Sequence, residues 1–369
     1  LNDLKLRLGY GITGNNGFGN GYTTRMYKAD GSMWPINNSW SYAYGSVRNV
    51  NPDLKWEQKA ELNIGIDFSF FRNRLYGKFD WYVRNVSDML YNINAPQPPM
   101  VHETIMKNIG NLQNKGWEFE LGGDVVQSKN FTYSSVMRLS RNTTRLKNIG
   151  LGDSEYIDQV KFPSPGQPGY GARMQNNMEI GQFFVYKHAG IDENGKWLIY
   201  DKNNNVVSAN NETLVADNKR FIGNAIPKLM LAWEHNLNYK NWDLGISLRS
   251  WIDFDIYSQI DMYYGLQTSK NKDIHDEKIL SDYFLSDGTF LKIDAVTLGY
   301  KLDLKKYNKY IDNVRFYLTA RDLAVFTKYD GPNPEVNING LNPGFEYIKD
   351  TDSMYPQTMR FTFGTQITF

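Results

Sequence analysis

The chain has 369 residues, a net charge of +1 at pH 7, 15% aromatic residues and no cysteine. Its length allows one large or two medium domains, its near-neutral charge gives no electrostatic case for a nucleic-acid partner, and the lack of cysteine excludes disulfides and thiolate chemistry. The histidines are scattered without the spacing of a metal site, so we expect no metal and no cofactor. No stretch approaches the roughly 20 apolar residues that a membrane-spanning helix needs.

Ten segments alternate between apolar and polar residues with the period of two that predicts a β-strand. The pattern is clearest in residues 61–70, where every even position is Leu, Ile or Phe. The alternation slips once within residues 290–302, which predicts a β-bulge. In chain order the segments are residues 4–10, 61–70, 75–84, 117–125, 131–139, 229–237, 244–252, 290–302, 314–320 and 357–369.

The links between these segments alternate in length. The links at residues 71–74, 127–130, 240–241 and 305–310 are short, whereas those after the odd-numbered segments are long. An up-and-down sheet with this order has every short turn at one end and every long loop at the other, as in outer-membrane barrels. A soluble sandwich has no reason to segregate its loops in this way. The longest loop, residues 147–225, is expected to hold a small hairpin at residues 183–200.

Charged residues lie almost wholly on one side of these strands, which a water-filled lumen tolerates and hydrocarbon does not. The opposite side is therefore expected to face lipid. The prediction is an all-β protein, an antiparallel up-and-down transmembrane β-barrel with long extracellular loops and short periplasmic turns. The residues expected to face lipid are Leu62, Ile64, Ile66, Phe68, Phe79, Trp81, Leu244, Ile246, Leu248, Phe316 and Leu318.

Several blocks of sequence carry a family likeness. The longest is NPDLKWEQKAELNIGIDFSFFRNRLYGKFDWYVRNVSDML at residues 51–90, and further blocks occupy residues 108–135, 220–248, 286–302 and 314–336. Together with the Phe-ended terminal strand, these blocks resemble SusC/RagA-type TonB-dependent outer-membrane transporters. They follow the order found in that family and span nearly the whole chain.

The resemblance implies that residues 1–369 form the C-terminal part of a barrel of about 22 strands. The family's N-terminal extension, TonB-contacting segment, plug and first barrel strands have no counterpart here, and the start of the chain is no signal peptide. The implied location is a bacterial outer membrane. The implied partners are membrane lipid, a SusD-like surface lipoprotein, TonB acting through the missing region, and the N-terminal half of the barrel in cis or as a separate chain. The residues implied to be read by the barrel-assembly machinery are Phe361, Phe363, Ile367 and Phe369.

The expected function is import of an oligosaccharide or, as the alternative, a peptide. Exposed loop aromatics can stack on sugar rings, although loop packing, a rim belt or contact with the lipoprotein would also explain them. The candidate substrate-binding residues are Trp34, Trp40, Tyr42, Tyr44, Trp197, Tyr263, Tyr264 and Tyr329.

Two further patterns have weaker functional interpretations. Asp192-Glu193-Asn194-Gly195 has oxygen ligands near a glycine, but a plain Asn-Gly hairpin turn explains it better. Same-face carboxylate pairs such as Glu118 with Glu120 and Asp253 with Asp255 are expected by chance on a polar strand face. No nucleophile or phosphate-binding motif accompanies them, so we expect no enzyme. The remaining alternatives are a passive porin-like barrel and a soluble carbohydrate-binding domain.

Overall fold

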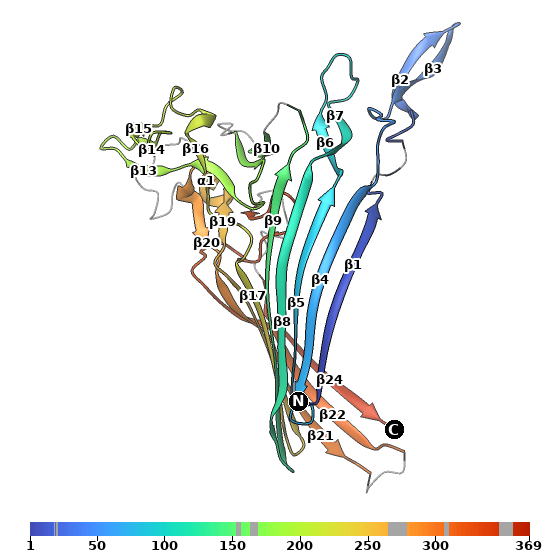
Figure 1. The fold of residues 1–369 in the computed structure, drawn as a ribbon, viewed down its shortest axis with the longest axis vertical. Helices are drawn as coiled ribbons and strands as arrows, with labels where there is room; N and C mark the ends of the chain where they lie inside the picture. The colour runs from blue at the N-terminus through green and yellow to red at the C-terminus, as the bar shows by residue number, and fades with distance from the viewer. Residues whose placement is uncertain are drawn as a thin grey trace.

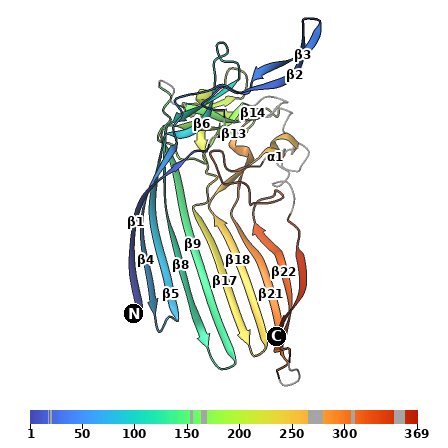
Figure 2. The same cartoon turned by 90° about the vertical axis from the view of Figure 1, so that its right-hand side faces the viewer.

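The computed structural model describes the whole chain except residues 18, 20, 153–155, 163–168, 265–278, 306–309 and 347–356. Ten long strands form one sheet that rises as a curved wall (Figure 1 and Figure 2). They correspond one to one to the ten predicted segments. From edge to edge they are β1 (Asp3–Asn15), β4 (Glu57–Phe70), β5 (Leu75–Ser87), β8 (Asn111–Gln127), β9 (Phe131–Asn148), β17 (Leu229–Tyr239), β18 (Trp242–Ile252), β21 (Phe290–Asp303), β22 (Asn313–Thr327) and β24 (Arg360–Thr368).

The two ends of the wall differ in their connections. The pairs β4–β5, β8–β9, β17–β18 and β21–β22 are joined by short links at the end that also holds both termini, which we call the turn end (Figure 1). The long links lie at the opposite end, the loop end. In the β4–β5 turn, Phe71, Arg72 and Asn73 adopt positive φ angles of 53°, 57° and 64°, which reverse the chain within four residues. The predicted alternation of short and long links is confirmed.

Antiparallel register gives the wall two continuous faces. Paired positions bring Ile64 beside Trp81 and Leu318 beside Phe363. Cross-strand pairing continues this side of the sheet through all ten strands, and we call it the apolar face. Its side chains are accessible, as the 38% exposure of Trp81 illustrates. All eleven residues that were expected to face lipid lie on this face, and none of them is packed into a dry interior.

The predicted bulge is confirmed in β21. The register with β22 shifts between Ile293 and Ala295, so Asp294 is the extra residue. Leu291 lies on the apolar face before the bulge and Leu298 lies on it afterwards. The bulge also directs the Asp294 carboxylate toward the opposite, polar face, where it lies 3.1 Å from Arg249.

The wall does not close on itself. Among the described residues, β1 pairs with β4 alone and β24 pairs with β22 alone, and Figure 2 shows these strands at opposite sides of the sheet. One edge of each strand therefore presents its backbone amides and carbonyls without a strand partner. Such edges cannot remain open in a bilayer, where every backbone polar group needs a hydrogen-bond partner.

The long links carry smaller elements at the loop end (Figure 1). The predicted hairpin within residues 183–200 is formed by β13 (His188–Ile191) and β14 (Trp197–Tyr200). Two hairpins are formed by β2 (Tyr27–Ile36) with β3 (Ser39–Ser46) and by β6 (Met89–Asn94) with β7 (Thr104–Ile109). A four-stranded sheet contains β10 (Tyr156–Lys161), β11 (Tyr170–Gln175), β12 (Phe183–Tyr186) and β16 (Lys219–Ile222). Two three-stranded sheets contain β13, β14 and β15 (Val206–Ser208), and β20 (Leu285–Asp287), β19 (Asp255–Ser258) and β23 (Phe345–Glu346). The helical elements are α1 (Gln259–Tyr264) and the 3₁₀ helices η1 (Ala216–Asn218) and η3 (Asp282–Phe284).

The largest hydrophobic core lies among these loop elements rather than in the wall. It packs Phe183, Trp197, Tyr257 and Phe345 from four separate strands, with each side chain at most 2% exposed. This core fixes the loop elements relative to one another at the mouth of the curved sheet. Within the described part of the chain, no helix is long and apolar enough to cross a membrane.

Candidate functional site

A cavity of about 940 Å³ lies at the loop end, between the β6–β7 hairpin and the β10–β11 pair. Its lining combines aromatic rings with amide side chains and few charges. The side chains with the most chemistry to offer are Tyr91, Asn92, Asn94, Lys107, Asn108, Tyr156, Asp158, Gln159 and Tyr170.

The β6–β7 hairpin is held firmly at its base. Met89 pairs with Ile109 across the hairpin, and these side chains are 4% and 2% exposed. The Asn108 side-chain amide donates hydrogen bonds to the carbonyl oxygens of Lys55 and Asp88, both at 2.9 Å. The hairpin therefore presents one fixed wall of the cavity.

The facing wall is ordered by a guanidinium group. Arg173 of β11 donates to both carboxylate oxygens of Asp158 at 2.6 and 3.1 Å, and its guanidinium carbon lies 3.6 Å from the centre of the Tyr156 ring. This stacking holds one side of the ring while Tyr156 remains 47% exposed. Burial raises the pKa of Tyr91, so its phenol stays protonated and can donate a hydrogen bond at neutral pH.

This arrangement suits binding of a polar, uncharged ligand. Tyrosine rings provide flat apolar surface with a polar tip, and Asn and Gln side chains both donate and accept hydrogen bonds. Sugar hydroxyls and peptide amides both match that chemistry. The cavity holds one cation, Lys107, and one carboxylate, Asp158, among the described residues that line it, and Arg173 already engages Asp158.

Four of the predicted aromatic residues lie together on the β2–β3 hairpin. Trp34, Trp40, Tyr42 and Tyr44 are 61–69% exposed, and the hairpin projects beyond the rest of the loop end (Figure 1). Trp40, Tyr42 and Tyr44 alternate along β3 and so share one face of the hairpin. They form an exposed aromatic surface that is separate from the cavity.

Three predicted residues differ from the expected exposure. Trp197, Tyr263 and Tyr329 are 1%, 8% and 6% exposed, respectively, within the loop-end cores. They offer no open ring face to a sugar, because neighbouring loop elements cover them; for example, the Tyr283 ring lies edge-on to Trp197 with centroids 5.2 Å apart. The side chain of Tyr264, at the end of α1, lies outside the described part of the chain.

The sequence interpretation missed the aromatic residues of the cavity, Tyr91, Tyr156 and Tyr170. Tyr91 lies in the short strand β6 soon after β5 ends at Ser87, while Tyr156 and Tyr170 lie in the longest loop. Their shared location depends on how β6–β7 and β10–β11 approach each other. The local signal that marks them is a tyrosine next to amide residues, as in Tyr91-Asn92, which is too common to identify a site.

The side chains considered for cation binding or catalysis have structural roles. Asp192 accepts hydrogen bonds from the backbone amides of Asn194 and Lys196 at 2.9 and 2.8 Å, which shapes the β13–β14 turn. Glu120 is paired with Arg138 at 2.6 Å on the polar face. Asp255 accepts from the backbone amide of Asn224 at 2.9 Å, and burial raises its pKa.

The polar face of the wall is crossed by ion pairs that link neighbouring and more distant strands. Arg138 of β9 lies between Glu120 of β8 and Glu234 of β17, at 2.6 and 2.9 Å. Arg315 of β22 reaches Asp243 of β18 at 2.5 Å across the intervening β21. Such pairs suit a wetted surface on which charges remain partly hydrated.

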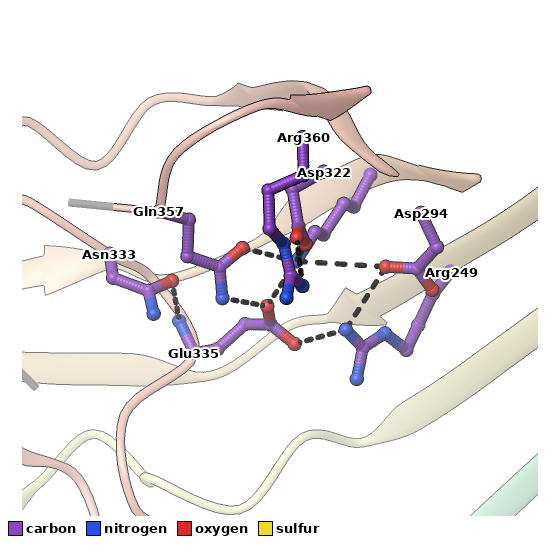
Figure 3. A network of polar contacts seen from close by, with 8 residues as sticks. Arg249, Asp294, Asp322, Asn333, Glu335, Gln357 and Arg360 are labelled. Atoms are coloured by element: carbon purple, nitrogen blue, oxygen red, sulfur yellow. Dashed lines mark hydrogen bonds and ion pairs between the residues drawn. The ribbon is translucent and has the colours of Figure 1, made fainter. Parts of the chain in front are cut away.

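The densest of these networks joins the wall to the loop between β22 and β24 (Figure 3). Lys292 of β21 is its centre, with Asp322 of β22 at 2.8 Å and Glu335 of the loop at 2.9 Å. Arg249 contacts Glu335 at 2.7 Å from the other side. The network holds the loop against the polar face near the mouth of the sheet.

The predicted assembly residues lie on the last strand of the wall. Phe361, Phe363 and Ile367 are 66%, 69% and 48% exposed on the apolar face of β24, and Phe369 directly follows that strand at 82% exposure. Their exposure leaves a row of large apolar side chains along one edge of the sheet.

Comparison with known proteins identifies the family. The model of the family described as TonB dependent receptor-like, beta-barrel matches residues 1–323. The TonB-dependent receptor SusC of Bacteroides thetaiotaomicron is 26% identical over 393 residues, an alignment that covers 100% of this chain and 38% of SusC. TonB-dependent receptor P3 of Formosa agariphila is also 26% identical, over 87% of this chain and 35% of P3.

A solved structure of the RagAB peptide transporter shares the fold, with a TM-score of 0.79 and 22% sequence identity. The match covers 100% of this chain and 41% of the RagAB chain, so this chain spans about two fifths of the length of the relatives it matches. Because the family model covers most of its length, the chain belongs to the TonB dependent receptor-like β-barrel family and is an outer-membrane barrel sequence of the SusC/RagA type.

Proposed function

We propose that this chain is the C-terminal section of the barrel of a TonB-dependent importer that takes up an oligosaccharide. The observation that carries the proposal is that the two faces and the loop end of the sheet differ in chemical character. One face carries mainly apolar side chains, the other carries ion pairs, and the cavity lies at the loop end, where outer-membrane barrels place their extracellular loops.

In this proposal the eleven predicted residues of the apolar face contact lipid and the polar face lines a lumen. The open edges of β1 and β24 are covered by the remaining strands of a barrel of about 22 strands, because a bilayer does not tolerate open sheet edges. The plug and the TonB-contacting segment belong to that remaining part, in cis or as a separate chain. Energy coupling would then reside outside these residues.

The cavity between β6–β7 and β10–β11 is the proposed substrate contact of this chain. Its tyrosine rings and amide side chains suit sugar ring faces and hydroxyls. The Arg173 guanidinium stacks on the Tyr156 ring and holds it in place. A peptide is the second candidate, because the same amides can bind a peptide backbone and the RagAB structure that shares this fold is that of a peptide transporter.

The exposed face of Trp40, Tyr42 and Tyr44 is the proposed docking surface for a SusD-like surface lipoprotein. Aromatic residues are enriched in the cores of protein interfaces, and these rings project beyond the loop end where a lid would sit. A passive pore would need neither a lid nor an energy source. A soluble carbohydrate-binding domain would have no use for the apolar face.

Uptake by cells that produce the complete transporter tests this function. Radiolabelled oligosaccharide and peptide pools are offered to cells with the natural protein or with Tyr91→Ala and Tyr156→Ala together. We expect oligosaccharide uptake that stops when the proton gradient is collapsed, and at least tenfold weaker apparent affinity in the variant. Tyr239→Ala, at the turn end, is the control and should retain natural uptake.

Uptake of the peptide pool alone, with the same loss of apparent affinity in the cavity variant, would show that the cavity binds peptides instead of oligosaccharides. Uptake that persists without the proton gradient would reject the importer in favour of a passive pore. A protein extracted without detergent would reject the membrane assignment of the faces altogether.

A further inference from the structure

The apolar face contains a hollow near the turn end. It has a volume of about 540 Å³ and is lined by side chains of β5, β8, β9 and β17. The hollow exists because two small residues, Gly123 and Ser135, are paired side by side in β8 and β9. Larger neighbours surround them, so the surface dips between large side chains.

The walls of this hollow are apolar. Leu75, Leu121, Met137 and Trp233 surround the small pair, and the Trp233 indole N–H donates to the Ser135 hydroxyl at 2.8 Å. The one polar group of the indole is therefore satisfied within the protein, and the ring presents carbon surface. Residues 121–125 alone extend the hollow by roughly 13 Å along β8, a length that accommodates part of a fatty-acyl chain.

The rim of the hollow at the turn end is cationic. Arg74 lines it, is exposed and donates a hydrogen bond to the Asp124 carbonyl at 3.2 Å. The β4–β5 turn and the β8–β9 turn together carry Arg72, Arg74 and Lys129. The one carboxylate beside them is that of Asp124 in β8, which also lines the hollow. The positive charge thus lies at the mouth of an apolar hollow.

Aromatic side chains mark the same end of the wall as a membrane interface. Phe71, Tyr239 and Trp242 are 71%, 52% and 49% exposed there, and the Trp242 and Tyr300 rings are in contact with centroids 4.8 Å apart. Such girdles sit at the level of lipid headgroups in outer-membrane barrels. Arg74 is therefore at headgroup level and the hollow is at the depth of the acyl chains.

We propose that this hollow is a binding site for one anionic phospholipid of the inner leaflet. One acyl chain fills the dip over Gly123 and Ser135, and the headgroup phosphate accepts hydrogen bonds from the Arg74 guanidinium. The anionic class follows from the excess of cations at the rim, since a zwitterionic headgroup would bring a positive charge to the same place. The site lies on the opposite face from the proposed substrate route and does not depend on what the transporter carries.

Native mass spectrometry of the complete transporter, purified from outer membranes and delipidated in detergent, tests the site. The probes are phosphatidylglycerol and phosphatidylcholine with identical acyl chains. We expect phosphatidylglycerol to bind at least tenfold more tightly. Arg74→Ala should abolish this preference, whereas Arg72→Ala, in the same turn but outside the lining, should stay within twofold of the natural protein.

A second variant fills the hollow. Val125→Trp places an indole at its exposed margin and should weaken both lipids at least fivefold, whereas Leu318→Trp adds the same group elsewhere on the apolar face and should have no effect. Heat-modifiable gel mobility checks that each variant is folded. Equal binding of the two lipids by the natural protein, or unchanged binding by Val125→Trp, overturns the proposal, as does a change in oligomeric state of Val125→Trp without loss of lipid, which would assign the hollow to a second copy of the protein.

Discussion

The ammonium group of Lys292 in β21 lies 2.9 Å from the carboxylate of Glu335, which is 43 residues further along the chain in the loop after β22. Lys292 is 1% exposed. It also lies 2.8 Å from Asp322 and donates a hydrogen bond to Gln357, just before β24. One buried cation thus ties the wall to both ends of the connection between β22 and β24 (Figure 3).

Replacing this cation should release the loop. Lys292→Met removes the cation that the Asp322 and Glu335 carboxylates share. Each carboxylate keeps only its more exposed partner, Arg360 or Arg249, and breaking a buried ion pair costs about 3 kcal/mol or more. We expect the free energy of unfolding to fall by about this amount and amide hydrogen exchange to accelerate in residues 328–346. Hydrogen-exchange mass spectrometry of the purified transporter measures both the extent and the place of the change.

The control for Lys292→Met is Lys305→Met at the other end of β21. Lys305 forms a 3.6 Å pair with Asp312, with side chains 69% and 44% exposed, and exposed pairs contribute about 0–1 kcal/mol. If residues 328–346 exchange equally in the natural protein and in Lys292→Met, the loop is held by other contacts.

The long strands could be predicted from sequence because their signal is local. A strand with one side in hydrocarbon and the other in water alternates between apolar and polar side chains. Tight turns such as residues 71–74 show where the chain reverses direction. The pairing of Ile64 with Trp81 then follows from the turn between them. Even the bulge at Asp294 left a visible slip in the alternation.

The loop end could not be predicted in this way because its contacts are distant in sequence. β12 pairs with β16 across more than thirty residues, and the Trp197 ring is covered by Tyr283 from a later loop. Nothing near Trp197 in the sequence indicates that burial. Exposed and buried aromatic residues therefore look alike before the loop elements are placed, and the cavity around Tyr91 and Tyr156 was missed for the same reason.

The loop-end core should respond to pH through Glu346. This side chain is 1% exposed and accepts a hydrogen bond from the Ser258 hydroxyl at 2.9 Å, and burial raises its pKa above the ordinary value of a glutamate. The folded state therefore favours the protonated form. The stability that this carboxyl contributes is present below its ordinary pKa and is lost as pH rises through the raised pKa.

We expect hydrogen-exchange protection of β19 and β23 to be greater at pH 5 than at pH 8. Glu346→Gln, which is neutral at both values, should remove most of this difference, and Glu193→Gln, an exposed change in the β13–β14 turn, should keep it. A natural protein with equal protection at both pH values would show that the Glu346 carboxyl is already ionised at pH 5 in the folded state, so that burial does not raise its pKa above that value.

The apolar row on β24 is proposed to act during assembly rather than in the finished barrel. Replacing Phe361 and Phe363 with Ser should lower the amount of assembled, heat-modifiable barrel in outer membranes several-fold. The same change at Phe316 and Leu318, on the neighbouring strand β22 and the same face, should lower it less. An equal loss of assembled barrel in the two variants would mean that the β24 residues act only as apolar surface, as other residues of the apolar face do.

The assignment of the two faces can be tested at adjacent positions of one strand. Ile64 lies on the apolar face near the middle of β4, and its neighbour Asn63 lies on the polar face. An arginine at the depth of hydrocarbon costs about 2–4 kcal/mol near the bilayer midplane, whereas lumen positions tolerate charge. We therefore expect Ile64→Arg to lower the free energy of unfolding in lipid vesicles by about that amount and Asn63→Arg to change it far less. Urea titration followed by gel mobility measures both, and the reverse order would exchange the lipid and water sides of the wall.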